Sequence, residues 1–260
     1  MPLIHDDFTY TEADHTSYTE QGYRIFDHFL SEDGLATCRS EIDAIFTRLE
    51  PGRDHAQIYS AHQQEPWMFD LARDPAILDM LEHQIGPNIV LWSSHLICKA
   101  PGTGIAIPWH QDAPYWNVKG VLPAGIWIAF DDMDEDNGAM SVLPGWHTKG
   151  KLPTKPNPDC ITFDTRIDPA ALPENANELR AQYRMPAGGA AIHDTMIPHV
   201  SRPNISERWR RVLVLRYIRA DAELGDKEYE DYRDGSSFPR RFFLVRGEDT
   251  NARELETTPF

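Results

Sequence analysis

The chain has 260 residues, of which 41% are hydrophobic and 25% are charged, a composition that excludes a disordered protein and allows a full core. Its 25 lysines and arginines stand against 41 acidic residues, which gives a formal net charge of -16. Because this charge repels phosphate backbones and anionic membrane surfaces, we expect no nucleic-acid and no membrane partner.

The N-terminal segment is polar and acidic, without the positive and apolar regions of a signal peptide. Two helices are predicted after it. The stretch 32–50 follows Ser31, an N-cap residue, and spaces its apolar residues for one helical face. The stretch 75–85 has Asp74 as N-cap, proline at its first position and Gly86 as its stop.

After Gly86 the sequence changes to short runs of branched and aromatic residues separated by turn-forming residues. The runs lie at 88–100, 105–112, 125–133, 138–145, 190–196 and 211–218. Helices followed by such strands, without helices between them, predict a mainly β fold with flanking helices, either a sandwich or a jelly-roll barrel. Barrels of this length often form one unit, so we expect a single domain over 1–260.

Two further features bear on organisation. The segment 149–178 is rich in Pro, Lys, Asn and Asp and lacks periodicity, so it is predicted to be an insert that acts as a lid over one end of the barrel. The three cysteines are widely spaced and odd in number, which argues against a disulfide framework and favours a reducing, cytoplasmic compartment.

A candidate metal site begins at His110 and Asp112, which lie two apart in an extended segment and so point to the same side. About two such pairs are expected by chance from this composition, and His5-Asp6-Asp7 is one that lies in a polar tail without a scaffold. His199 follows 89 residues after His110, at another strand end. Two histidines and one carboxylate can form the facial triad of non-haem Fe(II) oxygenases, although buried histidines satisfied by hydrogen bonds would show the same residues.

The residues around this triad resemble the phytanoyl-CoA dioxygenase family of Fe(II)/2-oxoglutarate oxygenases, over about residues 18–219. The matching pieces are Gly86-Pro87-Asn88-Ile89, Lys99-Ala100-Pro101-Gly102, Trp109-His110-Gln111-Asp112, Trp127-Ile128-Ala129, Asn137 to Met140, Leu143 to His147, and His199 to Asn204 with arginines following. The resemblance implies a double-stranded β-helix core of the jelly-roll, cupin-like type. It also implies Fe(II), 2-oxoglutarate and O2, with the last two converted to succinate and CO2.

Carried over residue by residue, the resemblance places the metal ligands at His110, Asp112 and His199. Cosubstrate contacts fall on His95, Trp127, Ser201 and Arg210. The acidic ligand is retained, whereas the family's halogenating members replace it with a small residue, so hydroxylation is favoured over halogenation. Two departures are Trp146 in the usual Pro-Gly-Ser-His piece and Val200 after the distal histidine.

Arg210 rather than Arg211 is predicted to bind the distal carboxylate of 2-oxoglutarate. It lies 11 residues after His199, as the family pattern requires, and a guanidinium suits a carboxylate because it offers a planar pair of donors. In a strand, Arg210 shares a face with Val212 and Val214, and Arg211 shares the opposite face. Arg202 and Arg208 are interpreted as surface residues.

Other chemistry-bearing residues receive structural interpretations. His147 is predicted to be a hydrogen-bonding residue at a turn, and Trp109 and Trp116 to be wall and packing residues. His193 and Asp194 are adjacent in a strand, so they point to opposite faces and are not expected to bind one metal ion. The acidic run 131–136 is interpreted as a solvated hairpin tip.

We expect the enzyme to hydroxylate an unactivated C-H bond of a small metabolite. The acidic net charge disfavours an acyl-CoA and favours an amine, an amino acid or a neutral compound, although net charge describes the distant field and not the pocket. The same ligands would serve desaturation, cyclisation or demethylation. A non-catalytic cupin-like module or a zinc site also fits the three ligands, and the sequence leaves the oligomeric state open.

Overall fold

The computed structural model describes residues 2–53, 56–102, 106–116, 118–158 and 164–260. The helices are α1 Glu12–Gln21, α2 Glu32–Thr47, α3 Pro66–Ala72, α4 Pro75–Ile85, α5 Ala113–Trp116 and α6 Ala176–Leu179, with 3-10 turns at Ala61–Gln63, Trp146–Lys149 and Pro169–Ala171. Within these residues, no helix has both the length and the apolar character needed to span a bilayer.

The two predicted helices are confirmed as α2 and α4. The side chain of Ser31 accepts a hydrogen bond from Gly34 N at 3.0 Å, which caps α2. Asp74 caps α4 in the same way through Ala76 N, and Gly86 ends that helix with a positive φ of 83°. Both helices bury their apolar residues, so local capping and tertiary packing agree.

The strands form two principal sheets. The larger sheet has the order β1-β10-β5-β12-β3-β15 with β2 paired to β3, and the smaller has the order β4-β11-β6-β9. The strands of the larger sheet are β1 Tyr23–Phe26, β2 Gln57–Tyr59, β3 Ile89–Lys99, β5 Ala124–Ala129, β10 Ala190–His193, β12 Arg210–Arg219 and β15 Phe243–Arg246. Those of the smaller sheet are β4 Ile107–His110, β6 Met140–Val142, β9 Ala181–Gln182 and β11 His199–Ser201. Two short hairpins complete the set, β7 Thr154–Pro156 with β8 Thr165–Ile167, and β13 Glu228–Glu230 with β14 Ser237–Pro239.

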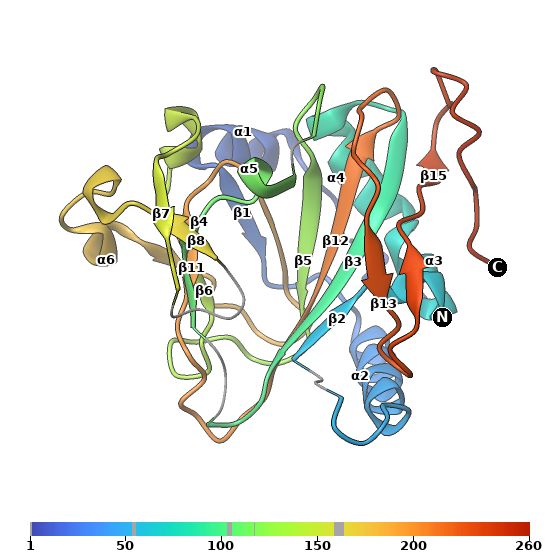
Figure 1. Cartoon of the computed structure of the whole chain (residues 1–260), viewed down its shortest axis with the longest axis horizontal. Coiled ribbons are helices and arrows are strands. Elements are labelled where there is room, and N and C mark those ends of the chain that lie inside the picture. Colours follow the sequence, from blue (N-terminus) through green and yellow to red (C-terminus); the bar gives the residue numbers. More distant parts are fainter. Residues whose placement is uncertain (1, 54–55, 103–105, 117, 159–163) are drawn as a thin grey trace.

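The chain passes between the two sheets as it proceeds. Strand β3 lies in the larger sheet, β4 in the smaller, β5 in the larger, β6 and β9 in the smaller, β10 in the larger, β11 in the smaller and β12 in the larger. The smaller sheet with β7 and β8 lies on the left of Figure 1, and the larger sheet occupies the centre. The predicted mainly β fold with flanking helices is therefore confirmed.

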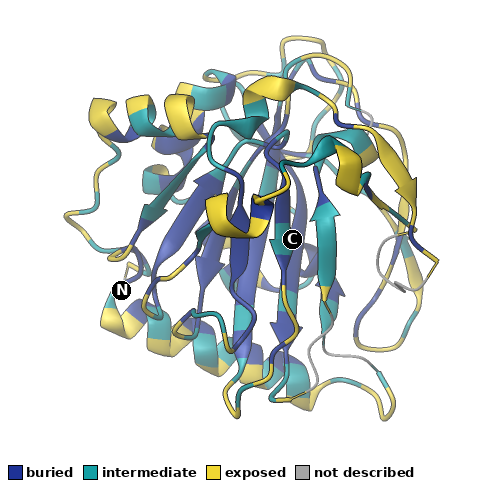
Figure 2. Cartoon of the chain, turned by 90° about the vertical axis from the view of Figure 1, so that its left-hand side faces the viewer, coloured by how far each residue is buried: buried dark blue, intermediate teal, exposed yellow. Residues whose placement is uncertain are grey.

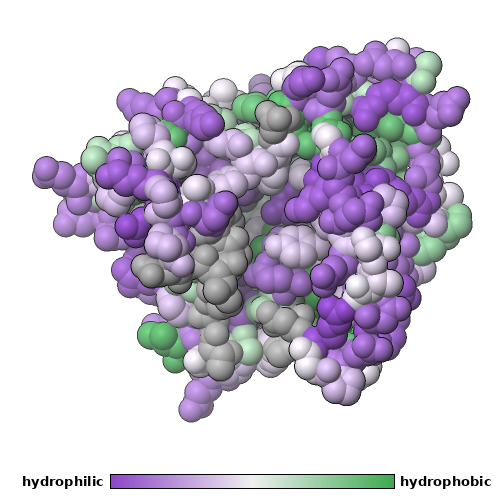
Figure 3. Space-filling view, in the orientation of Figure 1, coloured by the Kyte–Doolittle hydropathy of each residue, from purple (hydrophilic) through white to green (hydrophobic). Residues whose placement is uncertain are grey.

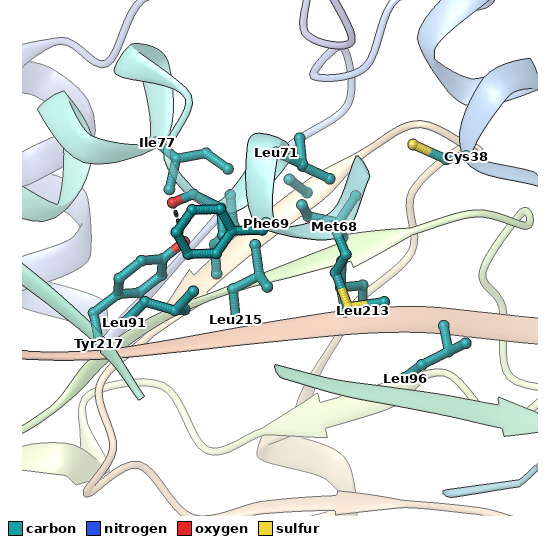
Figure 4. Packing of buried hydrophobic residues seen from close by; sticks show 14 of the residues in the cluster. Cys38, Met68, Phe69, Leu71, Ile77, Leu91, Leu96, Leu213, Leu215 and Tyr217 are labelled. Carbon is teal, nitrogen blue, oxygen red and sulfur yellow. Dashed lines mark hydrogen bonds between the residues drawn. The ribbon is translucent and has the colours of Figure 1, made fainter. Parts of the chain in front are cut away.

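The larger sheet has a different layer on each face. Its alternate residues Leu213, Leu215 and Tyr217 pack against helices α2, α3 and α4, where the Tyr217 hydroxyl donates to Ala72 O at 2.7 Å (Figure 4). The intervening residues Val212 and Val214 face the smaller sheet and contribute to a second buried cluster. Figure 2 shows the strands of the sheet as buried, with exposed residues on the outer turns of the helices and on the loops. Alternate side chains of β12 therefore contribute to two hydrophobic cores, one on each face of the larger sheet.

The acidic run 131–136 was predicted as a solvated hairpin tip, and this is wrong. Its flanking strands β5 and β6 lie in different sheets, so the segment crosses between sheets instead of turning back along one. Three of its carboxylates form ion pairs: Asp131 with Arg211, Asp134 with Arg208, and Glu135 with both Arg180 and Arg202. Arg202 and Arg208 thus lie at the surface, as predicted, with carboxylate partners.

Two of the three cysteines, Cys38 and Cys98, are buried. Cys160 and part of the segment predicted to be a lid lie outside the described residues. The remainder of 149–178 is more regular than its composition suggested, because it contains the β7/β8 hairpin, a 3-10 turn and the start of a one-turn helix. The Tyr115 hydroxyl lies 2.6 Å from Thr165 Oγ1 and so connects this hairpin to α5.

Candidate active site

Three candidate ligands converge where strands β4 and β11 pair. His110 at the end of β4 is the direct partner of His199 at the start of β11, and their ring centroids lie 3.9 Å apart. Asp112 follows β4, and its Oδ1 lies 3.7 Å from His110 Nε2 and 3.9 Å from His199 Nε2. One ligand atom from each residue falls within 4.8 Å of the other two. The structure therefore brings together His110, Asp112 and His199, although His199 lies 89 residues after His110 in the sequence.

Hydrogen bonds fix the orientation of both imidazoles. His110 Nδ1 lies 2.8 Å from Pro108 O, and His199 Nδ1 lies 3.0 Å from Ile197 O. A carbonyl oxygen can only accept, so Nδ1 carries the proton in each ring and Nε2 presents its lone pair toward the other ligands. Metal-binding histidines characteristically donate their second nitrogen in this way, which fixes the tautomer.

Electrostatics favours the protonation states that bind a cation. Burial lowers the pKa of His110 to about 3, so that ring is neutral near pH 7. Burial alone would raise the pKa of Asp112, but the neighbouring His199, Arg216 and His110 outweigh it, and the carboxyl pKa lies below its usual value. Two imidazole nitrogens and one carboxylate oxygen are the donor set of the non-haem Fe(II) facial triad, so the residues present fit that ion.

Arg210 lies deep in the same cavity. Its residue is 3% exposed, its guanidinium carbon lies 5.2 Å from the Trp127 ring centroid, and its Nε and Nη1 have no hydrogen-bond partner among the described residues. Burial lowers its pKa to about 10, which leaves it charged near neutral pH. Arg211 is on the opposite face and pairs with Asp131 at 2.9 Å and Asp43 at 3.0 Å. A buried cation with unpartnered donors is able to bind an anion.

The other predicted cosubstrate residues also border the cavity. His95 is buried in β3, stacks on Tyr59 at 4.0 Å, and its Nε2 lies 2.6 Å from Gln57 Oε1, an acceptor. Burial lowers the pKa of His95 well below its usual value, so its ring is neutral. Ser201 lies two residues after His199, and its Oγ accepts a hydrogen bond from Lys99 Nζ at 2.8 Å.

The cavity has a volume of about 380 Å³. Sequence reasoning missed several of its walls. The unpredicted lining residues include Gln57 and Tyr59 of β2, His193 at the end of β10, Arg216 of β12, and Lys227, Tyr229 and Arg240 of the C-terminal segment. The period-2 alternation that places Arg210 on the inward face of the strand also places Arg216 there, so Arg216 could have been predicted to line the cavity. The C-terminal residues belong to no motif.

The remaining candidates have structural roles or lie near the site. His147 Nε2 lies 3.0 Å from Thr19 O, which agrees with a hydrogen-bonding residue at a turn. Trp116 lines the cavity and packs edge-on against Trp92 at 5.3 Å between ring centroids. His193 was not expected at the metal site, yet its ring centroid lies 5.2 Å from that of His199. It therefore belongs to the wall beside the triad.

Comparison with known proteins gives a consistent result. The family model described as phytanoyl-CoA dioxygenase (PhyH) matches residues 18–212. The chain is 36% identical over 168 residues to the probable alpha-ketoglutarate-dependent hypophosphite dioxygenase of Stutzerimonas stutzeri, an alignment that covers 62% of this chain and 57% of that relative. It is 25% identical over 225 residues to the L-proline trans-4-hydroxylase of Streptomyces griseoviridis, covering 78% of this chain and 84% of the relative.

A solved structure shares the fold over nearly the whole chain. The non-heme monooxygenase ThoJ in its apo form superimposes with a TM-score of 0.72 at 25% identity, and the match covers 94% of this chain and 88% of ThoJ.

Proposed function

The chain belongs to the phytanoyl-CoA dioxygenase family, and we propose that it uses the cavity between its two sheets to oxidise a small molecule. It is a 2-oxoglutarate-dependent dioxygenase whose cofactors are Fe(II), 2-oxoglutarate and O2. The observation that carries the proposed site is the convergence of His110, Asp112 and His199, with both histidines oriented by backbone carbonyls.

In this proposal the three convergent residues hold Fe(II), and Arg210 binds the distal carboxylate of 2-oxoglutarate with Trp127 against its guanidinium. Ser201 and His95 contribute polar contacts from the neighbouring strands. Fe(II) held by these three residues would supply the redox chemistry that 2-oxoglutarate and O2 require. The protein's own contribution is to fix the ligands, neutralise the cosubstrate carboxylate and exclude water from the cavity.

The reaction proposed is hydroxylation of an unactivated C-H bond. One oxygen atom of O2 enters the substrate, the other enters succinate, and 2-oxoglutarate loses CO2. Retention of Asp112 supports hydroxylation rather than halogenation, while desaturation, cyclisation and demethylation remain alternatives that the ligands alone do not separate. A small substrate is supported by the cavity volume of about 380 Å³, which lies at the lower end for ligand sites and must also hold the cosubstrate.

We assign the two sheets to a double-stranded β-helix, or jelly roll. The assignment is supported by eight strands distributed between the two sheets, four in each, in the orders β10-β5-β12-β3 and β4-β11-β6-β9.

We also propose that the chain forms a single domain and that the segment of about 149–178 acts as a lid over the cavity. Limited proteolysis of the Zn(II)-loaded protein with and without 2-oxoglutarate and substrate tests the lid, because closure should protect this segment.

The metal proposal is tested by succinate release from 2-oxoglutarate. The wild-type protein should release succinate with Fe(II) and none with Zn(II), because Zn(II) has no redox chemistry. Substituting His110→Ala, Asp112→Ala or His199→Ala should abolish this release and weaken metal binding, while His5→Ala, in the N-terminal segment, should match the wild type. Equal turnover with zinc, or full turnover by the Asp112→Ala protein, would contradict the proposal.

A further inference from the structure

A second arginine lies at the other end of the strand that carries Arg210. In β12 the residues at 210, 212, 214 and 216 alternate onto the inward face, so Arg216 lies about 20 Å along the strand from Arg210. It lines the same cavity. Its guanidinium carbon lies 5.1 Å from the Trp116 ring centroid, and its buried Nε has no hydrogen-bond partner in the described part of the chain.

Two further cations border this outer end of the cavity. Lys227 Nζ lies 5.2 Å from the Tyr229 ring centroid, and the Arg240 guanidinium lies 5.0 Å from that of Trp92. Arg240 is held in place because it donates to Gly225 O at 2.5 Å and to the Tyr229 hydroxyl at 3.3 Å. In the orientation of Figure 1, hydrophilic residues gather over β13 and its surroundings (Figure 3).

The three cations differ from most other arginines of the chain in their partners. Arg211, Arg219 and Arg233 each pair with a carboxylate. By contrast, none of the three cations at the outer end forms an ion pair with a residue that the structure describes. Stacking on aromatic rings compensates in part for removing a cation from water, but it leaves the guanidinium donors available in the ring plane.

The charges of the cavity are therefore unequal along its length. Around the metal the charges of Fe(II), Asp112, 2-oxoglutarate and Arg210 cancel when the cofactors are bound, and Arg216 lies close enough to Asp112 to lower the pKa of that carboxyl. At the outer end Arg216, Lys227 and Arg240 outnumber the one other carboxylate of the lining, Asp164. A substrate thus meets a positive end in a chain whose net charge is -16. Local charge, and not the net charge that favoured an amine or a neutral compound, governs binding in a desolvated pocket.

From this arrangement we infer that the substrate is a small organic anion, whose carboxylate or phosphonate group binds to Arg216 with support from Lys227 and Arg240. The inference rests on the proposed function, since the anchored anion would direct its C-H bond toward His110, Asp112 and His199. Arg216 provides the bidentate fork that suits an oxyanion, and the two other cations add charge. The arginine pair on β12 would then hold the cosubstrate at one end and the substrate at the other.

Binding can be tested without turnover in the Zn(II)-loaded protein saturated with 2-oxoglutarate. Four probes of similar size are titrated by calorimetry: benzoate, phenylphosphonate, neutral benzamide and cationic benzylamine. We expect at least one of the two anions to bind about tenfold or more tightly than benzamide, and benzylamine to bind most weakly. Comparison of the two anions identifies the preferred group. Failure of both anions to bind more tightly than benzamide would overturn the inference.

Variants locate the anion site. Arg216→Gln should weaken binding of the preferred anion about ten- to fiftyfold, because it removes a half-buried charge and its paired donors. The matched control is Arg219→Gln on the same strand, since Arg219 already pairs with Asp221 outside the cavity, and it should change anion binding less than about twofold. Equal effects of the two substitutions would contradict the site.

A loss of 2-oxoglutarate affinity in the Arg216→Gln protein as large as its loss of anion affinity would assign Arg216 to the cosubstrate, and the inference would then be wrong. Fe(II)-dependent succinate release by the wild-type protein is measured separately. If succinate is absent while the anions still bind through Arg216, the proposed function fails and the anion site stands.

Discussion

Two ends of the same strand place similar residues in different surroundings. Arg210 and Arg216 both point inward from β12, both stack on a tryptophan, and both have buried nitrogen atoms without a partner among the described residues. Arg210 is almost fully buried and lines the same cavity as the metal-ligand candidates. Arg216 is half-buried and shares its end of the cavity with two more cations.

The difference follows from which parts of the chain build each end. The inner end is made by paired strands of the two sheets. In paired strands the register determines which side chains point into the cavity. The outer end is made by α5, by the end of β12 and by the C-terminal segment that holds Lys227 and Arg240. The family match covers residues 18–212, so it includes Arg210 and stops before all three outer cations. In the two proposals, the cosubstrate is thus bound by residues inside the family match, and the substrate by residues beyond it.

The largest effect that we expect is a loss of 2-oxoglutarate affinity on substitution at the inner end of the cavity. Arg210→Gln should reduce 2-oxoglutarate affinity roughly 30- to several-thousand-fold, because it leaves a desolvated carboxylate without its charged partner. The control Arg211→Gln, whose side chain pairs with Asp131 on the opposite face, should reduce it less than about fivefold. Calorimetric titration of the Zn(II)-loaded proteins measures both. A large loss confined to Arg211→Gln would move the cosubstrate site to the other face of the strand.

Salt should weaken ligand binding at the two ends to different extents, and this difference should be smaller than the effect of the Arg210 substitution. Raising the ionic strength from about 0.05 to about 0.5 M shortens the screening length to a few ångströms, and exposed charges feel this more than buried ones. We expect affinity for the preferred anion probe to fall about five- to tenfold, and affinity for 2-oxoglutarate to fall about twofold. Equal salt dependence for the two ligands would show that the ends do not differ in solvent access.

The smallest expected effect concerns protons at the inner end. Burial lowers the pKa of Lys99 to about 6, with a further contribution from the charge of Arg210. Lys99 Nζ donates to Ser201 Oγ, so a carboxylate bound at Arg210 and Ser201 would lie near it and raise its pKa. Binding then takes up a proton, and the affinity for 2-oxoglutarate should fall about two- to fivefold from pH 6 to pH 8.

The lysine is identified as the source of this pH dependence by substitution. Lys99→Met removes the titrating group and should flatten the profile of 2-oxoglutarate affinity against pH. The profile of the anion probe at the outer end should not change. Retention of the full pH dependence in the Lys99→Met protein would assign the proton to another group.

The sequence predicted those parts of the molecule that rest on local pattern. Caps and apolar spacing identified α2 and α4, and period-2 alternation put Arg210 and Arg211 on opposite faces. Helix α1 was missed because it is polar and buries only Asp14, so it has no apolar stripe. Its signal was the capping box in which Thr11 and Asp14 bond reciprocally.

The outer half of the cavity could not be predicted in the same way. Tyr59 lies on a three-residue strand, and Lys227 and Arg240 lie on segments whose position depends on how the C-terminal chain packs over β3 and β12. No spacing rule links them to the triad. The net charge favours an amine or a neutral compound, whereas the cations that line the outer end favour an anion, because a sum over 260 residues does not describe the few that line one cavity.

The most direct test measures the affinities of both ligands for the wild-type protein and for a variant of each arginine, in one set of titrations. Wild-type, Arg210→Gln and Arg216→Gln proteins loaded with Zn(II) are each titrated with 2-oxoglutarate, and then with the preferred anion probe. We expect 2-oxoglutarate affinity to collapse only in Arg210→Gln, and anion affinity, measured at saturating cosubstrate, to collapse only in Arg216→Gln. Loss of both affinities in the same variant, with neither lost in the other, would contradict two anion sites at the ends of one strand.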